Sequence, residues 1–518
     1  MSEVANKSRL KPSNPMTSSP TRKLAEYVRD TTFEDLPHDV VNRAKLFILD
    51  SIGCGLGGST TALGSLAVRA LSQQSRGSRL IIGRQECVNA QTSAFLNAML
   101  INAMDYDESS PAGHLSATIV GTLLALLRQS GVTGRDWLLS YVIGFEVCSR
   151  IAVATRPSVD RFSKVWGLGT FQTFGAVAAA AKLGNASEEQ ILNAMGIAGA
   201  SAPVPSAQKW GWDNRPLSCI KDAVALPAQI GILATSLAES GFVGCRDILD
   251  GPKGFWRMAG SDKCDFEKMT AGLGDAYLLR NASFKTYPCC WFIHPTLDAI
   301  RHILDSNQLG PDDIERIDVR SLTDLAENFS FKNPKSLVDA QFSLPYCVAM
   351  LLLGVKTGPA WFDEHRFLDD SVLRQASKVF VHADERADSK FHIERRISSR
   401  ISISAIDGEQ FEFAARAPRG SPDNPIAPEA VVRKFSELAN PVLGTRIADR
   451  VADLVLGLDR ESCMTALPGL IGRSSECRNS TTAIADRRQT CGRRGIGRSQ
   501  RERDQTFIGV RVSVGGNK

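Results

Sequence analysis

The hydrophobic pattern in the first half of the chain has the period of a helix. In residues 39–54, apolar side chains recur at intervals of three and four, which places them on one helical face. The glycine-rich run 53–58 is predicted to end this helix. Residues 173–183 are Ala-rich and predict a second helix, and a capping box in residues 187–190 starts the next one. Residues 22–278 are therefore expected to form closely packed helices.

The pattern changes to alternation in the second half of the chain. Residues 314–322, 379–383 and 401–414 alternate apolar and polar side chains and contain many β-branched residues, which is typical of strands. Asp407 and Gly408 lie between two alternating runs and predict a tight hairpin. This part of the chain is therefore expected to have an α+β structure.

Helical periodicity returns in residues 429–458, a segment too short to form a domain alone. We expect it to rejoin the first helices. The predicted fold class is thus mainly α with an α+β insertion, in which a smaller α+β lid domain interrupts a large all-helical domain. In chain order we expect a disordered leader (1–21), the first part of the helical domain (22–278), the lid domain (279–424), the return segment of the helical domain (425–460) and a disordered basic tail (461–518).

The composition excludes a collagen-like, a coiled-coil and a wholly disordered protein. Of 518 residues, 43% are hydrophobic and 23% are charged, as in globular proteins of more than one domain. Residues 461–518 contain 11 Lys/Arg and 5 Asp/Glu, which leaves 50 and 51 for the rest of the chain, so the net charge of +5 belongs to the tail. The tail lacks the interleaved aromatics of an RNA-binding arm, which stays the weaker alternative to a solvated tail. No apolar run reaches the roughly 20 residues that span a bilayer, so neither nucleic acid nor membrane is expected as a partner.

The twelve cysteines form neither a Cys-x-x-Cys pair nor a Cys/His cluster. No secretory signal precedes them, so we expect reduced thiols and no metal site. The Ser/Pro-rich leader favours a cytoplasmic protein, with a mitochondrial transit peptide as the weaker alternative.

The most concentrated set of chemical groups lies in residues 105–114, between two predicted helices. Asp105, Ser109 and His114 belong to it, together with further acids and hydroxyls. A helix N-terminus directly after His114 favours an anion, and an imidazole is suited to proton transfer near neutral pH. The alternative, at least as well supported by spacing alone, is an acidic turn whose Asp and Ser residues cap helices.

Two further candidates precede predicted helices. Trp166 opens a Gly-rich entry to the Ala-rich helix. Such a turn can bind a carboxylate or phosphate on its backbone N–H groups, or it can simply allow close packing. Lys221 stands at the start of an apolar helix, where it either faces a substrate carboxylate or forms an ion pair with Asp222.

The last candidates lie at the junction of the helical and α+β parts, where clefts form. Lys285 and His294 are nine residues apart there, and Cys289 and Cys290 between them are expected to pack rather than react. Tyr346 either presents its hydroxyl to the same cleft or is a buried structural tyrosine.

Together these runs resemble the MmgE/PrpD family, which includes 2-methylcitrate dehydratase and cis-aconitate decarboxylase. The resemblance covers about residues 22–460. It rests on five runs in order: Leu36-Pro37 to Ile52-Gly53-Cys54, Met104-Asp105-Tyr106-Asp107 to His114, Lys221-Asp222, Lys285-Thr286-Tyr287-Pro288 to His294, and Ala340-Gln341-Phe342-Ser343-Leu344-Pro345-Tyr346. The resemblance implies an active site between a helical domain and a lid, a homodimer, and neither a metal nor an organic cofactor.

The resemblance also implies roles for single residues. Catalytic positions fall on Asp105, His114, Lys221 and Tyr346, and substrate-binding candidates are Ser109, Trp166, Lys285 and His294. Trp166 stands where many members, decarboxylases included, carry His, and it can enlarge the apolar part of the pocket.

The expected function is therefore a cofactor-independent dehydratase that removes water from 2-methylcitrate or a longer alkylcitrate. A cis-aconitate-type decarboxylase and a non-catalytic dimeric member of the family are the alternatives. In this hypothesis His114 abstracts a proton, and Asp105 orients His114 or helps to protonate the leaving hydroxyl. Lys221 and Lys285 stabilise the developing negative charge, and Tyr346 is a second donor.

Overall fold

A computed structural model of the protein describes residues 19–127, 131–162, 164–165, 169–203, 215–218 and 224–472. Within these ranges helices dominate, and the strands form one four-stranded sheet and one two-stranded ribbon. The prediction of a mainly α protein with some β structure is therefore confirmed.

The first half of the chain is helical apart from the ribbon of β1 (Arg79–Leu80) and β2 (Cys87–Val88). Its helices are α1 (Pro20–Asp30), α2 (His38–Ser59), α3 (Ala62–Ser72), α4 (Ala90–Asn102), α5 (Leu115–Leu126), α6 (Gly134–Ala154), α7 (Val159–Phe162), α8 (Gln172–Leu183), α9 (Glu188–Ser201), α11 (Ala225–Glu239), α12 (Phe255–Met258) and α13 (Phe266–Thr270). The predicted capping box at Ser187 and Gln190 is present at the start of α9. Helices α4 and α5 pack together, as do α6 and α8.

The glycine run does not end α2, contrary to the sequence-based prediction. The helix continues through Gly53, Gly55, Gly57 and Gly58 to Ser59. A Cβ atom at Gly58 would lie 2.0 Å from the carbonyl oxygen of Leu100 in α4. These glycines therefore serve close helix packing, which outweighs their low helix propensity.

The second half of the chain carries the larger sheet. Its strands are β3 (Ile314–Ser321), β4 (Val379–Ala383), β5 (Ser399–Ala405) and β6 (Gln410–Ala415), and its helices are α14 (His294–Asn307), α15 (Thr323–Asn328), α16 (Leu337–Gln341), α17 (Leu344–Leu352), α18 (Asp370–Ser377) and α19 (Glu385–Glu394). The strand order is β4-β3-β5-β6, with β3 and β4 parallel and the other neighbours antiparallel. The predicted hairpin joins β5 to β6, and Gly408 adopts a φ of 94° there.

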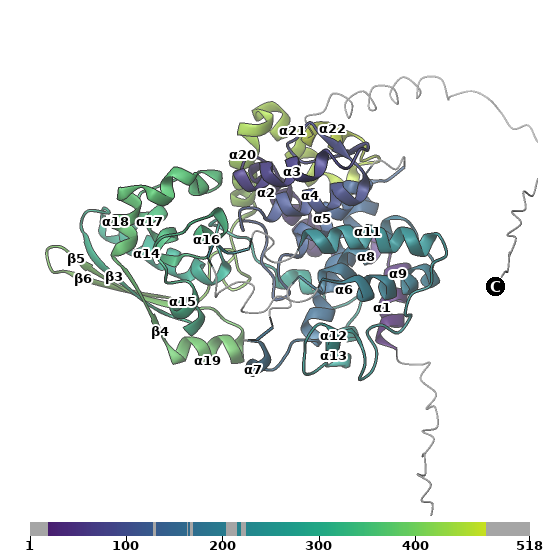
Figure 1. The fold of residues 1–518 in the computed structure, drawn as a ribbon, viewed down its shortest axis with the longest axis horizontal. Helices are drawn as coiled ribbons and strands as arrows, with labels where there is room; N and C mark the ends of the chain where they lie inside the picture. Colours follow the sequence, from purple (N-terminus) through teal and green to yellow (C-terminus); the bar gives the residue numbers. More distant parts are fainter. Residues whose placement is uncertain are drawn as a thin grey trace, which may run out of the picture.

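The chain then returns to the first helices, as predicted. Helices α20 (Pro428–Leu443) and α21 (Thr445–Leu456) follow the sheet, and α20 packs against α2. Figure 1 shows the sheet with α14 to α19 on one side of the molecule, and α20 and α21 beside α2 on the other. The division into a helical domain and a lid domain stays a prediction.

The expected leader (1–21) and the expected disordered tail (461–518) both include residues that the structure describes as helical. Helix α1 begins at Pro20, inside the expected leader, and residues 461–472 are ordered and include α22 (Ala466–Ile471). Met464, Leu467 and Ile471 are buried, and the Met464 N–H donates to the Val132 carbonyl at 3.0 Å. These few apolar residues suffice because they pack on helices already present. Residues 473–518 lie outside the described part of the chain.

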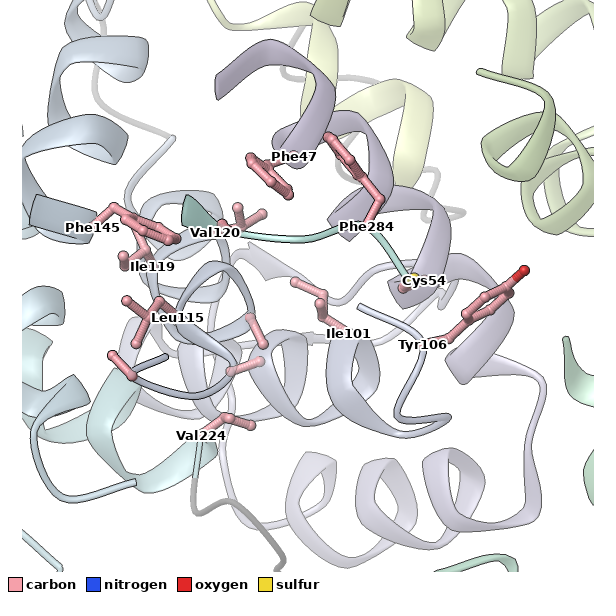
Figure 2. Close-up of a cluster of buried hydrophobic side chains, with 14 of the residues drawn as sticks. Phe47, Cys54, Ile101, Tyr106, Leu115, Ile119, Val120, Phe145, Val224 and Phe284 are labelled. Atoms are coloured by element: carbon pink, nitrogen blue, oxygen red, sulfur yellow. The ribbon is translucent and has the colours of Figure 1, made fainter. Parts of the chain in front are cut away.

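The core of the helical part supports both segments that carry candidate chemistry. Phe47 of α2 stacks on Phe284, with ring centroids 4.1 Å apart. Figure 2 shows this pair beside Leu115 and Ile119 of α5, with Tyr106 at the edge of the same cluster. The segments on either side of residues 105–114 and 285–294 are thus anchored in one apolar core.

Helix α6 is long and apolar enough to cross a membrane, but 89% of its most apolar window is buried inside the protein. A joint α2–α3 span passes the same test only if a bend of 84° is ignored. Core helices pass this test as membrane helices do, so it is weak evidence for a membrane protein.

Candidate active site

A cavity of about 530 Å³ lies where the helical part meets the sheet-bearing part. Its wall is formed by the loop between α4 and α5, by residues 281–292, and by residues 391–423 around β5 and β6. Four of the predicted site residues line it: Asp105, Ser109, His114 and Lys285. The sequence motifs from the two halves of the chain therefore do meet at one cavity.

Asp105 occupies a backbone conformation that is costly for a residue with a Cβ atom. Its φ is 52°, and its side chain is buried. Lys285 holds it there, because the ammonium donates to the Asp105 carbonyl at 2.9 Å and to Oδ1 at 2.8 Å. Gln341 supports the same loop by donating to the Ala103 carbonyl at 2.7 Å.

His114 is placed between two carboxylates at the start of α5. Its Nε2 lies 3.2 Å from Asp105 Oδ1, and its Nδ1 lies 3.3 Å from Asp107 Oδ2. All three side chains are buried, yet His114 and Asp105 reach the cavity wall. The loop thus places an imidazole, a side chain that can accept and donate protons, between two carboxylates at the cavity wall.

Glu108 fulfils the capping role that was the alternative interpretation of this loop. Its two carboxylate oxygens accept the N–H groups of Leu115 at 3.1 Å and Ser116 at 2.9 Å, at the N-terminus of α5. Burial, and next the charge of Asp107, raise the pKa of Glu108 to about 7. The loop thus contains one capping acid and two acids that face the imidazole.

A second buried lysine, Lys434, contacts the same group of residues. Lys434 of α20 lies 2.7 Å from Asp50 of α2 and donates to the carbonyls of Tyr106 at 2.6 Å and Lys285 at 3.1 Å. Burial alone would lower the pKa of Lys434. The negative charge of Asp50 has the opposite effect, and the pKa of Lys434 is raised above its ordinary value. The resulting group of buried residues, called here the charge cluster, consists of Asp50, Asp105, Asp107, His114, Lys285 and Lys434.

Sequence reasoning missed Asp50 and Lys434 as parts of the site. Asp50 lies in the part of α2 that is buried on all sides, and Lys434 lies on the apolar face of α20, among Val431, Phe435 and Leu438. A charged residue within a buried stripe needs a partner, and that signal was available in the sequence. Arg156 and Arg395, which also line the cavity, were missed too.

The other predicted residues differ in position. Ser109 lines the cavity and pairs with Ser283, whose N–H donates to its carbonyl at 2.7 Å. His294 is fully buried against Tyr287 and Trp291 and is not part of the cavity lining. Burial, and next the charge of Lys285, hold the pKa of His294 well below its usual range, so the ring is neutral.

Tyr346 matches the structural alternative rather than the catalytic one. It is 1% exposed, its hydroxyl donates to the Trp361 carbonyl at 2.5 Å, and it does not line the cavity. Its motif reaches the site through Gln341 instead. Lys221 and Trp166 lie outside the described residues.

Three ligand-type groups of the charge cluster are close enough to hold a metal ion. One atom each of Asp105, Asp107 and His114 lies within 4.8 Å of the others. The Lys285 ammonium already binds Asp105 Oδ1 in this space. The prediction that no metal is needed is therefore open to a direct test.

A buried imidazole between carboxylates, beside an ammonium ion at the wall of a cavity, is an arrangement that can carry out proton transfer. The chain belongs to the MmgE/PrpD family: the MmgE/PrpD N-terminal domain matches residues 22–267 and the MmgE/PrpD C-terminal domain matches residues 287–460.

The curated relatives carry a common name. The chain is 27% identical to cis-aconitate decarboxylase-like protein oryM of Aspergillus oryzae, over 87% of this chain and 97% of that protein. It is 26% identical to cis-aconitate decarboxylase of Aspergillus terreus (88% and 96% covered) and 27% identical to the human cis-aconitate decarboxylase (91% and 100% covered). These relatives are lyases by name, and they match this chain over nearly its whole length.

Proposed function

We propose that this protein is a lyase that acts on a tricarboxylate of the aconitate or citrate type, using its own side chains for proton transfer. The observation that carries the proposal is the position of His114, within 3.3 Å of Asp105 and Asp107 and at the wall of a cavity that Lys285 also lines. The names of the relatives support the substrate class.

Decarboxylation of an aconitate-type acid is the first candidate reaction. The bond between a carboxylate carbon and its neighbour breaks, CO₂ leaves, and the electron pair stays on the neighbouring carbon. Lys285 lies where an ammonium can stabilise this negative charge, and His114, held between two carboxylates, can deliver the proton that forms the new C–H bond. The decarboxylase names of the relatives favour this reaction.

Dehydration of 2-methylcitrate or a longer alkylcitrate is the second candidate. Here neutral His114 takes the proton beside a carboxylate, and the hydroxyl group leaves as hydroxide and is protonated to water. Trp166 favours this reaction, because it replaces a His that the family resemblance associates with decarboxylases.

One experiment separates the two reactions. Purified protein is incubated with cis-aconitate, 2-methylcitrate and a longer alkylcitrate, and the products are analysed by mass spectrometry. Loss of CO₂ from cis-aconitate supports a decarboxylase, and loss of water from a citrate supports a dehydratase. A folded sample that changes none of these acids contradicts the proposal and favours the non-catalytic alternative.

We also propose that the protein is a cytoplasmic homodimer. Among the described residues, the cysteines other than Cys87 are free thiols, which suits a reducing compartment. Light scattering coupled to size-exclusion chromatography tests the dimer, and fluorescence microscopy of the tagged chain tests its location against mitochondrial import.

A further inference from the structure

The lining of the cavity carries more positive than negative charge. Five Lys/Arg and three Asp/Glu side chains contribute to it. Two of these cations already face a carboxylate: Lys285 lies 2.8 Å from Asp105, and Arg396 lies 3.2 Å from Asp423. The other three, Arg156, Arg395 and Arg416, have no carboxylate partner among the residues that the structure describes. Arg156 and Arg395 are called here the arginine pair.

The arginine pair comes from the two different parts of the fold. Arg156 follows α6, and its guanidinium lies 5.4 Å from the ring centroid of Phe162. Arg395 is the C-cap of α19 and has a φ of 62°, a left-handed conformation for which helix ends usually use glycine. The fold thus accepts a costly backbone conformation where it places this arginine at the cavity.

The two guanidinium groups disfavour one another. Burial lowers the pKa of Arg156 to about 10, and the charge of Arg395 adds to this effect. Burial also lowers the pKa of Arg395. Arg156 is half-buried and Arg395 is exposed. Two like charges without an acidic partner are stabilised by an anion, and a guanidinium is the side chain best shaped to bind a carboxylate.

A second cavity adjoins the arginine pair. It has a volume of about 440 Å³ and shares four lining residues with the first cavity: Pro111, Arg156, Phe162 and Arg395. The pair therefore lies at the junction of the two cavities, in reach of a ligand in the first one.

We propose that Arg156 and Arg395 together bind one carboxylate of the substrate and thereby link the end of α6 to the end of α19. The inference rests on the proposed function for the identity of its ligand, a tricarboxylate. His114 and Lys285 serve the reacting carbon, and the arginine pair selects acids with a further carboxylate. Both arginines are positioning and specificity residues for that reaction.

The test measures binding separately from turnover. Arg156→Met, Arg395→Met and the double variant are titrated calorimetrically with tricarballylate, a saturated tricarboxylate that has no hydroxyl group to lose. Each single substitution is expected to raise Kd about tenfold or more, because each removes a charge-assisted hydrogen bond. The double variant should lose less than the product of the two single effects, since both arginines hold one group.

Thermal unfolding without ligand shows whether a loss of binding comes from misfolding. Removing either charge relieves a repulsion, so the Tm of the ligand-free variants should stay level or rise, while the increase in Tm on adding tricarballylate shrinks. Arg257→Met is the matched control, because Arg257 also stacks on an aromatic ring, Trp256 at 4.7 Å, and lines neither cavity. Its Kd should equal that of the unmodified protein.

The outcomes distinguish this inference from the proposed function. Unchanged Kd in both single variants, no binding of tricarballylate to the unmodified protein, or weaker binding together with a lower ligand-free Tm overturns the inference, even if the enzyme turns over a tricarboxylate. Arginine-dependent binding without turnover of any tested acid supports the inference and contradicts the proposed lyase.

Discussion

In the charge cluster, buried cations are matched by carboxylates: Lys285 lies 2.8 Å from Asp105, and Lys434 lies 2.7 Å from Asp50. The arginine pair lines the same cavity as Asp105 and Lys285, yet neither of its two cations forms an ion pair with an acid of the described residues. A matched cluster keeps its geometry whether or not substrate is present, which suits proton transfer. Unmatched cations instead gain stability from an anion that arrives, which suits binding.

The largest expected effect comes from removing the cation of a buried ion pair in the charge cluster. Lys434→Met leaves Asp50 buried without its cation, and breaking a buried pair in this way typically costs about 3–5 kcal/mol. Urea unfolding should show this loss of stability. The exposed neighbour Arg433→Met is the control and should change stability little, and adding Asp50→Asn to Lys434→Met should restore part of the loss. An unchanged midpoint for Lys434→Met would refute the role of this pair.

Removal of the imidazole tests whether the cluster performs chemistry. His114→Ala is expected to lower turnover about 100-fold or more, because it removes the proposed proton carrier. The Kd of tricarballylate should change much less, because the arginine pair is intact. Steady-state kinetics and calorimetry on the same variant check this, and near-normal turnover removes His114 from the mechanism.

Glu108 provides a pH-dependent test of the cluster. Its pKa is about 7 in the folded protein and 4.5 in the reference state, so the folded state binds more protons between these values. Stability should therefore fall as pH rises from about 4.5 to about 7, by an amount on the order of 2–3 kcal/mol. Urea unfolding at the two ends of this range measures the change.

The matched variant for this test is Glu108→Gln, which cannot ionise. The amide of the substituted side chain has one acceptor oxygen where the carboxylate has two, so the variant should be less stable throughout, but with a smaller dependence on pH. An equal dependence in both proteins would show that another group is responsible.

The smallest expected effect is that of metal removal. The Lys285 ammonium already binds Asp105 Oδ1, one of the three groups that could hold an ion, so we expect no stoichiometric metal. Elemental analysis and turnover with and without a chelator check this. A bound ion with chelator-sensitive turnover would show that the matching charge is a metal rather than lysine.

Part of this site could be predicted from sequence because its residues are close together along the chain. Asp105 and His114 share one loop, and Lys285 belongs to a run that the change of hydrophobic pattern placed at the junction of the helical and α+β parts. Lys434 could not be paired with Tyr106 in this way, because the two are 328 positions apart and the sequence does not show which helix faces which. Local periodicity predicted the helices and the hairpin. It did not predict that α2 continues beyond its glycines, because that depends on close packing against α4.

The motifs also could not give the direction in which side chains point. His294 and Tyr346 belong to segments near the cavity, but both side chains turn into the interior, towards Trp291 and the Trp361 carbonyl respectively. Gln341, five positions before Tyr346, makes the contact with the Asp105 loop instead. A motif identifies a segment, and packing decides which of its residues serves the site.

The place of Lys434 near the end of the ordered chain affects how the protein is made. During translation, Asp50, Asp105 and His114 leave the ribosome long before α20 is synthesised. The nascent chain therefore contains Asp50 without the lysine that pairs with it until Lys434 has been added. A chain terminated before α20 contains His114, Asp105 and Lys285 but lacks this ammonium. A stop codon at any of positions 424–434 would therefore remove the Lys434 ammonium without removing any residue that lines the cavity.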